Sequence, residues 1–359
     1  MVATTHGPLA GVRIVELDTP GPVLFAGMLL ADLGCDVVRI RPEGLDGSSI
    51  VPLLYRGRSE VSLDLSTAAG RERALALIAR ADGVIEGYRP GVAEQIGLDP
   101  ARCLAANPGL VYARTSGWGR EGPLAGKPGN DINHLALSGA LHAIGSAATP
   151  MPPLNLVGEY AGGALFLALG LVSAILAAQA TGRGQVIEAA QVDGAAALMT
   201  LYYGLHDAGR WADARASNLV DGGAPFYRCY ACADGRHVAV GALDPPAFAA
   251  LCRGLGIDGS RFDQLDRSCW PALGEATAAA FATRPRDEWA ALFGDGEACV
   301  TPVLSLTEAP LHPHNRARGT FAAVAGAMQP SPAPRFSATP AEPAAAEGAS
   351  VEEILARWE

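Results

Sequence analysis

The chain has 359 residues, of which 49% are hydrophobic, and its formal net charge is −10. This length suggests about two domains of ordinary size. The hydrophobic content excludes a mainly disordered protein, because disordered chains have too few apolar residues to build a core. The negative charge argues against a general nucleic-acid binder, so an anionic ligand has to be held by a local basic cluster.

Strand and helix patterns alternate in the first third of the chain. Repeated βα units of this kind predict an α/β fold with a parallel sheet and right-handed crossovers. No GxGxxG motif opens the first predicted helix, so the dinucleotide-binding fingerprint is absent. The predicted strands cover residues 12–17, 35–40, 61–65, 83–88 and 110–115, and the predicted helices cover 20–34, 68–80 and 101–106.

The middle of the chain contains an uncharged segment, residues 161–180, that approaches the length of a membrane-spanning helix. The segment is rich in Gly and Ala, has no aromatic belt, and lies between Glu159 and the sequence Gly-Arg-Gly at 182–184. We therefore interpret it as a buried core helix and expect no membrane span. A second helical run, from Asp131 to about Ala143, precedes it.

The sequence pattern changes from helical to strand-like near residue 225. The run DGGAPFYRCYACADGRHVAVGALD predicts antiparallel strands joined at residues 233–235, and helices follow. We expect a large domain at 1–224, a small α+β domain at 225–315, and a C-terminal segment at 316–359 that returns to the large domain. Seven scattered cysteines, an odd number, indicate reduced thiols and a cytoplasmic protein.

Ordered motifs run along the whole chain and include ADLGCDVVRIRP, IEGYRPGVAEQIGL, GNDIN, PPLNLVGEYAGG and GQVIEAAQVDG. They resemble those of family III CoA-transferases, and within that family they are most similar to the α-methylacyl-CoA racemases. The resemblance implies a Rossmann-like large domain, a small domain, and an interlinked homodimer whose active site lies between the large domain of one subunit and the small domain of the other. It also implies an acyl-CoA ligand, with coenzyme A as part of the substrate and no metal or redox cofactor.

The phosphates of coenzyme A require local arginine or lysine side chains and backbone donors. Five arginines lie at predicted strand ends or βα loops, where open α/β sheets bind ligands. For two of them, Arg56 and Arg58, a solvated surface charge is the alternative interpretation. The five are Arg39, Arg41, Arg56, Arg58 and Arg89.

The resemblance assigns the phosphate contact to Arg41 at the end of VVRIRP. Two departures weaken the expected binding, because Gln95 replaces a family arginine and Ser66 replaces a family lysine. The other positions that the resemblance places against coenzyme A are Leu63, Leu65, Gly87, Tyr88, Arg89 and Asp131.

The positions that should carry the chemistry differ from the racemase pattern. A racemase needs two acid/base groups on opposite sides of the carbon next to the thioester. The family histidine in GHDIN is Asn130 here, the family aspartate in NLVGDF is Glu159, and the supporting glutamate in GAIEP is Asp244. Asparagine cannot accept a proton at physiological pH, so Glu159 is the expected main base.

Three interpretations follow from these changes. In the first, the protein remains an acyl-CoA isomerase of the racemase or epimerase type, and His134, four residues after Asn130, either supplies the missing imidazole or lines the pocket wall. In the second, Glu159 is the nucleophile of a CoA-transferase. In the third, the fold has been adapted to other chemistry or only binds a ligand. The racemase-like small domain favours the first.

Overall fold

The computed structural model describes residues 6–43, 52–324 and 326–359. The chain forms two compact units: the first comprises Met1–Ser138, Leu154–Met199 and Pro313–Glu359, and the second comprises Gly139–Pro153 and Thr200–His312. The second unit therefore begins earlier in the chain than the expected boundary at residue 224. The change from helical to strand-like patterning near residue 225 marks the start of the sheet of the second unit. The chain has by then already left the first unit, after Met199.

A parallel sheet forms the centre of the first unit, in the strand order β12-β3-β2-β1-β4-β5-β6. Every neighbouring pair in it is parallel, which confirms the predicted α/β class. The order reverses between β1 and β4, and open α/β sheets bind ligands at the carboxyl ends of the strands at such a point. The strands are β1 (Arg13–Leu17), β2 (Asp36–Pro42), β3 (Arg58–Leu63), β4 (Gly83–Glu86), β5 (Val111–Ser116), β6 (Gln185–Ala190) and β12 (Glu347–Gly348).

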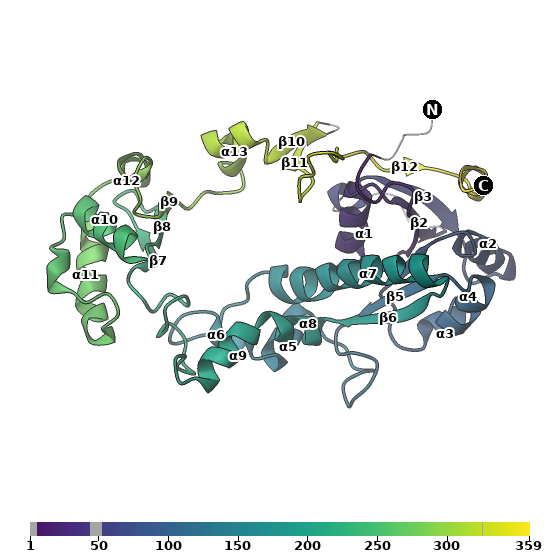
Figure 1. The fold of residues 1–359 in the computed structure, drawn as a ribbon, viewed down its shortest axis with the longest axis horizontal. Coiled ribbons are helices and arrows are strands. Elements are labelled where there is room, and N and C mark those ends of the chain that lie inside the picture. Colours follow the sequence, from purple (N-terminus) through teal and green to yellow (C-terminus); the bar gives the residue numbers. More distant parts are fainter. Residues whose placement is uncertain (1–5, 44–51, 325) are drawn as a thin grey trace. The chain divides into compact units, whose positions relative to one another are not determined.

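Helices cover both faces of this sheet (Figure 1). Helices α1 (Pro22–Asp32) and α7 (Phe166–Thr181) pack on one face with residues such as Val23 and Leu171. On the other face, residues of α2, α4 and α14 share a core with alternate residues of the strands. The remaining helices of the first unit are α2 (Ala68–Ile78), α3 (Val92–Ile96), α4 (Pro100–Ala106), α5 (Asp131–Leu137), α8 (Gln191–Leu198), α13 (Pro313–Arg318) and α14 (Val351–Arg357), with the short helix η1 (Pro52–Tyr55).

The uncharged segment lies within one continuous helix that begins as a π-helix, η2 (Leu156–Leu165), and continues as α7. By length and composition Leu156–Thr181 could cross a membrane, and 44% of its most apolar window is buried within the chain. One face packs on the sheet, as a core helix should. The other face exposes Leu165, Leu169 and Leu176, whose exposed fractions are 48%, 65% and 69%.

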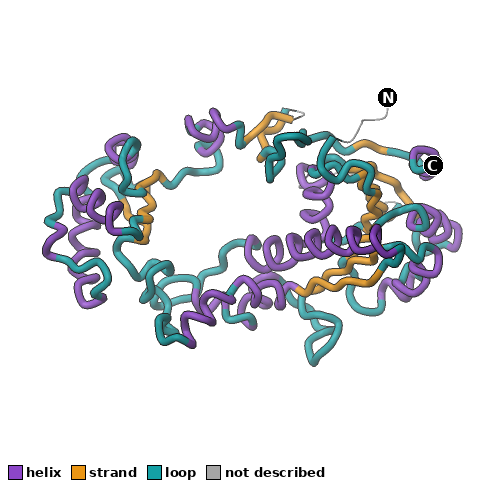
Figure 2. Tube along the Cα trace, in the orientation of Figure 1, coloured by secondary structure: helices purple, strands orange, loops and turns teal. Residues whose placement is uncertain are grey.

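The second unit has a three-stranded antiparallel sheet, β7-β8-β9, covered by helices that Figure 2 shows in purple. The predicted hairpin is confirmed as β7 and β8, and β9 joins it from a distant part of the chain. Buried aromatic side chains such as Phe226, Trp270 and Phe281 form its core. Its elements are α6 (Ala140–Ala143), α9 (Thr200–Asp207), β7 (Tyr227–Ala231), β8 (His237–Gly241), α10 (Pro245–Leu255), η3 (Gly259–Arg261), η4 (Arg267–Cys269), α11 (Trp270–Phe281), α12 (Arg286–Phe293), β9 (Val300–Pro302) and η5 (Ala309–Leu311).

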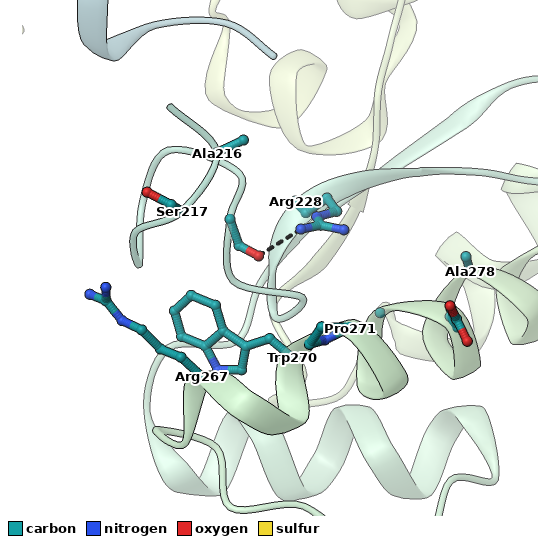
Figure 3. A pocket seen from close by; sticks show the side chains of 10 residues that line it. Ala216, Ser217, Arg228, Arg267, Trp270, Pro271 and Ala278 are labelled. Atoms are coloured by element: carbon teal, nitrogen blue, oxygen red, sulfur yellow. Dashed lines mark hydrogen bonds between the residues drawn. The ribbon is translucent and has the colours of Figure 1, made fainter. Parts of the chain in front are cut away.

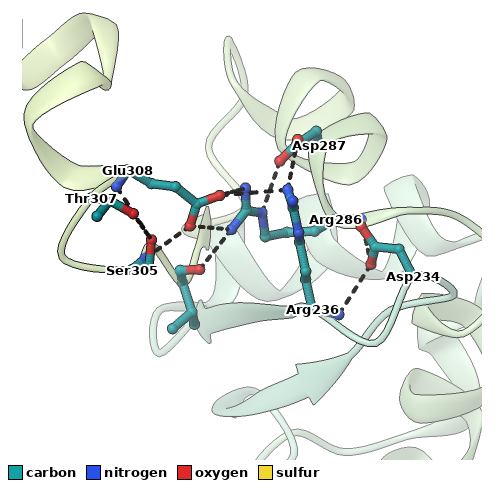
Figure 4. A network of polar contacts seen from close by, with 8 residues as sticks. Asp234, Arg236, Arg286, Asp287, Ser305, Thr307 and Glu308 are labelled. Atoms are coloured by element: carbon teal, nitrogen blue, oxygen red, sulfur yellow. Dashed lines mark hydrogen bonds and ion pairs between the residues drawn. The ribbon is translucent and has the colours of Figure 1, made fainter.

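A buried arginine holds the end of the second unit together (Figure 4). Arg286, at the start of α12, donates to Glu308 Oε1 at 2.8 Å and to the Val303 carbonyl at 2.9 Å. Its guanidinium also contacts Asp287. Because all these partners lie on α12 or after β9, the network fixes the segment that leads back to the first unit.

The C-terminal segment returns to the first unit through the hairpin β10 (Phe321–Val324) and β11 (Ala327–Pro330). Arg56 Nη1 donates to Gln329 Oε1 at 2.9 Å and to the Pro330 carbonyl at 2.8 Å. Further on, β12 pairs with β3, and Trp358 Nε1 donates to Asp36 Oδ2 at 2.7 Å. These contacts join residues 273 and 322 positions apart in sequence, so they close the first unit around its sheet.

Three of the five arginines expected near coenzyme A are internal. Arg39 contacts Asp18 at 2.7 Å, and Arg56 contacts Asp32 at 2.5 Å. The surface-charge interpretation of Arg56 and Arg58 is wrong, and neither side chain is open to a phosphate. Both project under α1, where each guanidinium neutralises a carboxylate that burial would otherwise isolate.

The pair formed by Arg58 and Glu16 is fully buried, with Nε and Oε2 2.7 Å apart. Arg58 also donates to the carbonyls of Leu24 and Leu54. Gly27 of α1 leaves the necessary space, because an added Cβ would lie 2.0 Å from Glu16 Oε2. The pair therefore sets how closely α1 approaches the sheet.

Arg58→Met should lower the free energy of unfolding by about 3–5 kcal/mol, because it leaves Glu16 as a buried charge without a partner. Chemical denaturation measures this value. Arg73→Met is the matched control, since its pair with Glu352 is exposed, and it should have little effect. Equal effects of the two substitutions would contradict the role of the buried pair.

A second buried carboxylate supports the loop after β4. Glu86 Oε2 accepts from the backbone N–H of Tyr88 at 2.6 Å, whereas Oε1 has no hydrogen-bond partner among the described residues. Burial raises the pKa of Glu86 from 4.5 to about 7, although the Tyr88 N–H and the charges of Arg120 and Arg114 oppose the shift. The loop therefore rests on a carboxyl that holds its proton more tightly in the folded chain.

This pKa predicts a pH dependence of stability. The folded state binds the Glu86 proton up to about pH 7 and the unfolded state only up to about 4.5, so this contribution is lost as the pH rises between those values. Glu86→Gln removes it. We expect the variant to gain stability relative to the parent chain from pH 4.5 to 7 in denaturation experiments. Glu121→Gln, at an exposed position, should show no such trend, and parallel curves for the parent and Glu86→Gln would contradict the assignment.

Candidate functional site

Two loops meet at the carboxyl ends of β1 and β4, where the strand order reverses. The first, residues 18–21, connects β1 to α1, and the second, residues 87–91, follows β4. They are in direct contact, because a Cβ added to Gly87 would lie 2.9 Å from Thr19 Oγ1 and 3.0 Å from Val23 Cγ2. A larger residue at 87 would therefore push the loops apart.

The 87–91 loop carries a cation at this edge of the sheet. Arg89 is exposed and makes no ion pair with any residue the structure describes. Tyr88 is half-buried against the core, and burial first, then the charges of Glu86 and Asp18, raise its pKa to about 12. Arg41 lies half-buried on β2, two strands away from β4 in the sheet.

The two leucines expected against coenzyme A lie on and after β3. Leu63 is 3% exposed and belongs to the core, and Leu65 packs against the same core. A contact from Leu63 to a ligand therefore has to come from its backbone. Ser66, at the position of the family lysine, is bonded to the Asp64 carboxylate at 2.6 Å and carries no positive charge.

Glu159 lies in the first turn of η2 and faces the β1–α1 loop. Its carboxylate is 3.8–4.0 Å from the position of a Cβ added to Gly21, whose φ of +88° favours glycine. Asn155 Nδ2 donates to Glu159 Oε1 at 3.1 Å. Burial raises the pKa of Glu159, the Asn155 hydrogen bond opposes this, and the charge of Asp131 adds to it.

Asn130 and Asp131 lie where α5 begins. Asn130 is exposed, and its backbone N–H donates to Asn133 Oδ1 at 3.0 Å. Asp131 is 8% exposed, and its Oδ1 accepts from the backbone N–H of Glu159 at 2.5 Å. This bond joins the start of α5 to η2, and Asn130 directly precedes the residue that makes it.

His134 lies inside the wall behind this site. It is 1% exposed, its Nδ1 is 2.9 Å from Gln191 Oε1, and its ring stands edge-on to Trp118 at 4.5 Å. Its Nε2 faces Gly117, where an added Cβ would lie 2.1 Å away. Burial lowers the pKa of the imidazole. This setting favours the interpretation of His134 as a residue of the pocket wall over that of a substitute base.

Asp244 lies in the second unit, whereas Asn130 and Glu159 lie in the first. It is exposed and caps α10 by accepting from the backbone N–H of Ala247 at 2.9 Å. The three positions that differ from the racemase pattern are therefore divided between the two units.

The second unit also holds a hollow of about 630 Å³ between α11 and the segment before β7 (Figure 3). Arg228, Arg267 and Trp270 are among its lining residues. Arg228 is already bonded to the carbonyls of Gly222 and Gly223, at 2.8 and 2.6 Å. None of the residues expected in the site lines this hollow.

The arrangement around Glu159 suits proton transfer. A half-buried carboxylate with a raised pKa is an effective base near neutral pH, and the neighbouring Asn130 amide can only donate or accept hydrogen bonds. Among the described residues, no group of three or more His, Cys, Asp or Glu side chains could hold a metal ion. Sequence reasoning missed Asn155, although its i, i+4 spacing to Glu159 was a usable signal.

Comparison with known proteins yields relatives of two kinds. The chain is 42% identical to mouse α-methylacyl-CoA racemase over 96% of this chain and 91% of the relative, and 40% identical to the human protein of that name over 93% and 88%. It is 29% identical to acetyl-CoA:oxalate CoA-transferase of Acetobacter aceti over 91% of this chain and 89% of the relative.

The fold agrees with a solved structure of a CAIB/BAIF family protein from Brucella suis. The TM-score is 0.83 at 22% identity, covering 99% of this chain and 100% of that one. The model of CoA-transferase family III matches residues 9–348. With nearly the whole chain matched, and with relatives 40% and 42% identical over most of its length, the chain belongs to CoA-transferase family III.

Proposed function

We propose that the protein is an acyl-CoA isomerase of the α-methylacyl-CoA racemase or epimerase type. The observation that carries the proposal is Glu159, a half-buried carboxylate with a raised pKa beside the ligand crevice of the sheet. In this scheme Glu159 takes the proton next to the thioester carbonyl, giving an enolate and a protonated Glu159. Return of this proton to the same face restores the starting configuration. Inversion requires the planar enolate to take a proton from solvent on its opposite face, after which Glu159 releases its own proton to solvent.

Other residues bind and orient the substrate. Arg89, and Arg41 near the end of β2, contact the phosphates of coenzyme A, and Gly87 and Tyr88 hold its nucleotide. Asn130 hydrogen-bonds the thioester or the acyl group. Asp244 reaches the site from the second unit of a partner subunit. No metal or redox cofactor takes part, and coenzyme A enters with the substrate.

A single base predicts an unequal outcome for exchange and inversion. Protonated Glu159 exchanges its proton with solvent and returns it from the same side, so exchange of the α-proton should outpace inversion. Asn130→His adds a second acid/base group and should raise the ratio of inversion to exchange. NMR of 2-methylacyl-CoA in deuterated water, combined with chiral analysis, measures both rates.

Glu159→Gln keeps the shape of the side chain and removes its basicity, so exchange should fall by about 10²–10⁴-fold. Glu159→Asp retains a carboxylate and should preserve more activity than the glutamine variant. Full activity of Glu159→Gln would show that another group removes the proton.

The alternative function is CoA transfer with Glu159 as nucleophile, which the CoA-transferases among the relatives support. That reaction forms an acyl-glutamyl anhydride and then a glutamyl-CoA thioester. Trapping with hydroxylamine and locating the modification by mass spectrometry distinguishes the two. A label on Glu159 would favour the transferase.

Arg89→Ala should weaken acyl-CoA binding by about ten- to a hundredfold, because it removes a charge-assisted contact worth about 1.5–3 kcal/mol. Calorimetric titration measures the affinity. Arg183→Ala is the matched control, because Arg183 is exposed and precedes β6 at the opposite, amino edge of the sheet. Unchanged affinity of the Arg89 variant would remove this loop from the ligand site.

We further propose that two copies form an interlinked homodimer. The exposed leucines of α7 provide an apolar stripe at helical spacing that a second copy would cover, and the division of the site between two units fits a shared centre. An interlinked dimer cannot separate without unfolding. Analytical ultracentrifugation should therefore find no monomer on dilution, and a concentration-dependent monomer would refute the linkage.

A cytoplasmic location is also part of the proposal. All seven cysteines are free, and none forms a disulfide in the chain. Unpaired thiols of this number are typical of a reducing compartment. Fractionation of cells that express the chain tests this directly, and recovery with membranes or in an exported fraction would contradict it.

A further inference from the structure

We propose that Asp131 is the positioning residue of Glu159, orienting its backbone and holding a fixed negative charge beside its carboxyl. The inference rests on the proposed role of Glu159 as the base. It assigns to the Asp131 side chain a task other than contact with coenzyme A.

The geometry directs the Asp131 carboxylate toward Glu159. Its Oδ1 accepts from the Glu159 backbone N–H at 2.5 Å, although the two residues are 28 positions apart. Gly158 makes room for this contact, because an added Cβ there would lie 2.6 Å from Asp131 Oδ1. The first turn of η2 therefore has its position fixed by α5.

The second oxygen of the Asp131 carboxylate indicates that this side chain does more than bond the Glu159 N–H. Asp131 Oδ2 is buried and has no hydrogen-bond partner among the described residues. A side chain needed only to bond one N–H could be a neutral hydroxyl, which would bury no second, unpartnered polar atom. Burying Asp131 Oδ2 without a partner costs free energy, and a function for the negative charge explains why a carboxylate stands here.

Asp131 is also the charged group that acts on Glu159. Helix α7 has no titratable side chain, and the carboxylate of Asp32 on α1 is held by Arg56. The His134 imidazole of α5 is bonded to Gln191. The other titratable groups on the elements packed against η2 are Asp193 of α8, Glu188 of β6, and Tyr112 and Arg114 of β5.

The proposed proton transfer explains why a negative charge beside Glu159 would be useful. With asparagine at position 130, one carboxyl has to take the α-proton and also return it. A very acidic carboxyl would be a weak base, and proton transfer is most efficient when the pKa of the group lies near the working pH. A neighbouring negative charge disfavours the ionised form of Glu159 and so moves its pKa in the required direction.

The test compares the pH dependence of kcat/KM for α-proton exchange in the parent chain and in Asp131→Asn. The amide keeps an oxygen for the Glu159 N–H and removes the charge. We expect the acidic limb of the profile to move to lower pH, since the pKa of Glu159 falls. Asp193→Asn removes a charge from an exposed position on α8 and should leave the limb unmoved.

A titration without substrate separates this inference from the proposed function. The measurement is ¹³C NMR of the chain with labelled glutamate side chains. The signal of Glu159 is assigned as the one that is missing from the spectrum of Glu159→Gln. The pH midpoint of its titration should be lower in Asp131→Asn than in the parent chain. If Glu159→Gln retains exchange, the proposed function fails, but this titration still tests Asp131. An unmoved midpoint, or a raised KM with an unmoved acidic limb, would overturn the inference. Asp131→Ser replaces the asparagine variant if that variant does not fold.

Discussion

The reversal of strand order between β1 and β4 is the constraint on which the site depends. The loops after the two strands meet at this point, and open α/β sheets bind ligands at such a reversal. Thr19 and Gly21, two residues apart on one loop, contact Gly87 and face Glu159 respectively. The proposed ligand loop and the proposed base are therefore aligned by a single short connection.

The buried ion pairs of the first unit hold α1, the sheet and the C-terminal segment together. Arg58 binds Glu16 beneath α1, and Arg56 joins Asp32 to the returning C-terminal hairpin. Both arginines come from the start of β3, so one short segment fixes α1 and closes the unit. Arg89 is exposed at the loop after β4, and a local cation of this kind allows a chain with a net charge of −10 to hold an anionic ligand.

The carboxylates near the crevice differ in what their surroundings do to them. Burial raises the pKa of Glu86, which supports the 87–91 loop through the Tyr88 N–H. Glu159 is less buried and has Asn155 and Asp131 as neighbours with opposing effects on its pKa. The same side-chain type thus supports a loop in one place and is suited to proton transfer in the other, because the degree of burial and the partners differ.

From the sequence alone follow the α/β class, strands β1–β5, helices α1, α2 and α4, the hairpin of the second unit, and the family. Periodicity and ordered motifs are local or linear properties, so they can be read without the fold. The sequence also identified Glu159 as the remaining base, since asparagine cannot carry a proton. It could not show that Arg56 and Arg58 are internal, because burial depends on which strands become neighbours. Only the tertiary structure placed His134 inside the wall and Asp131 against the Glu159 N–H, because contacts between residues distant in the chain arise from packing rather than from spacing.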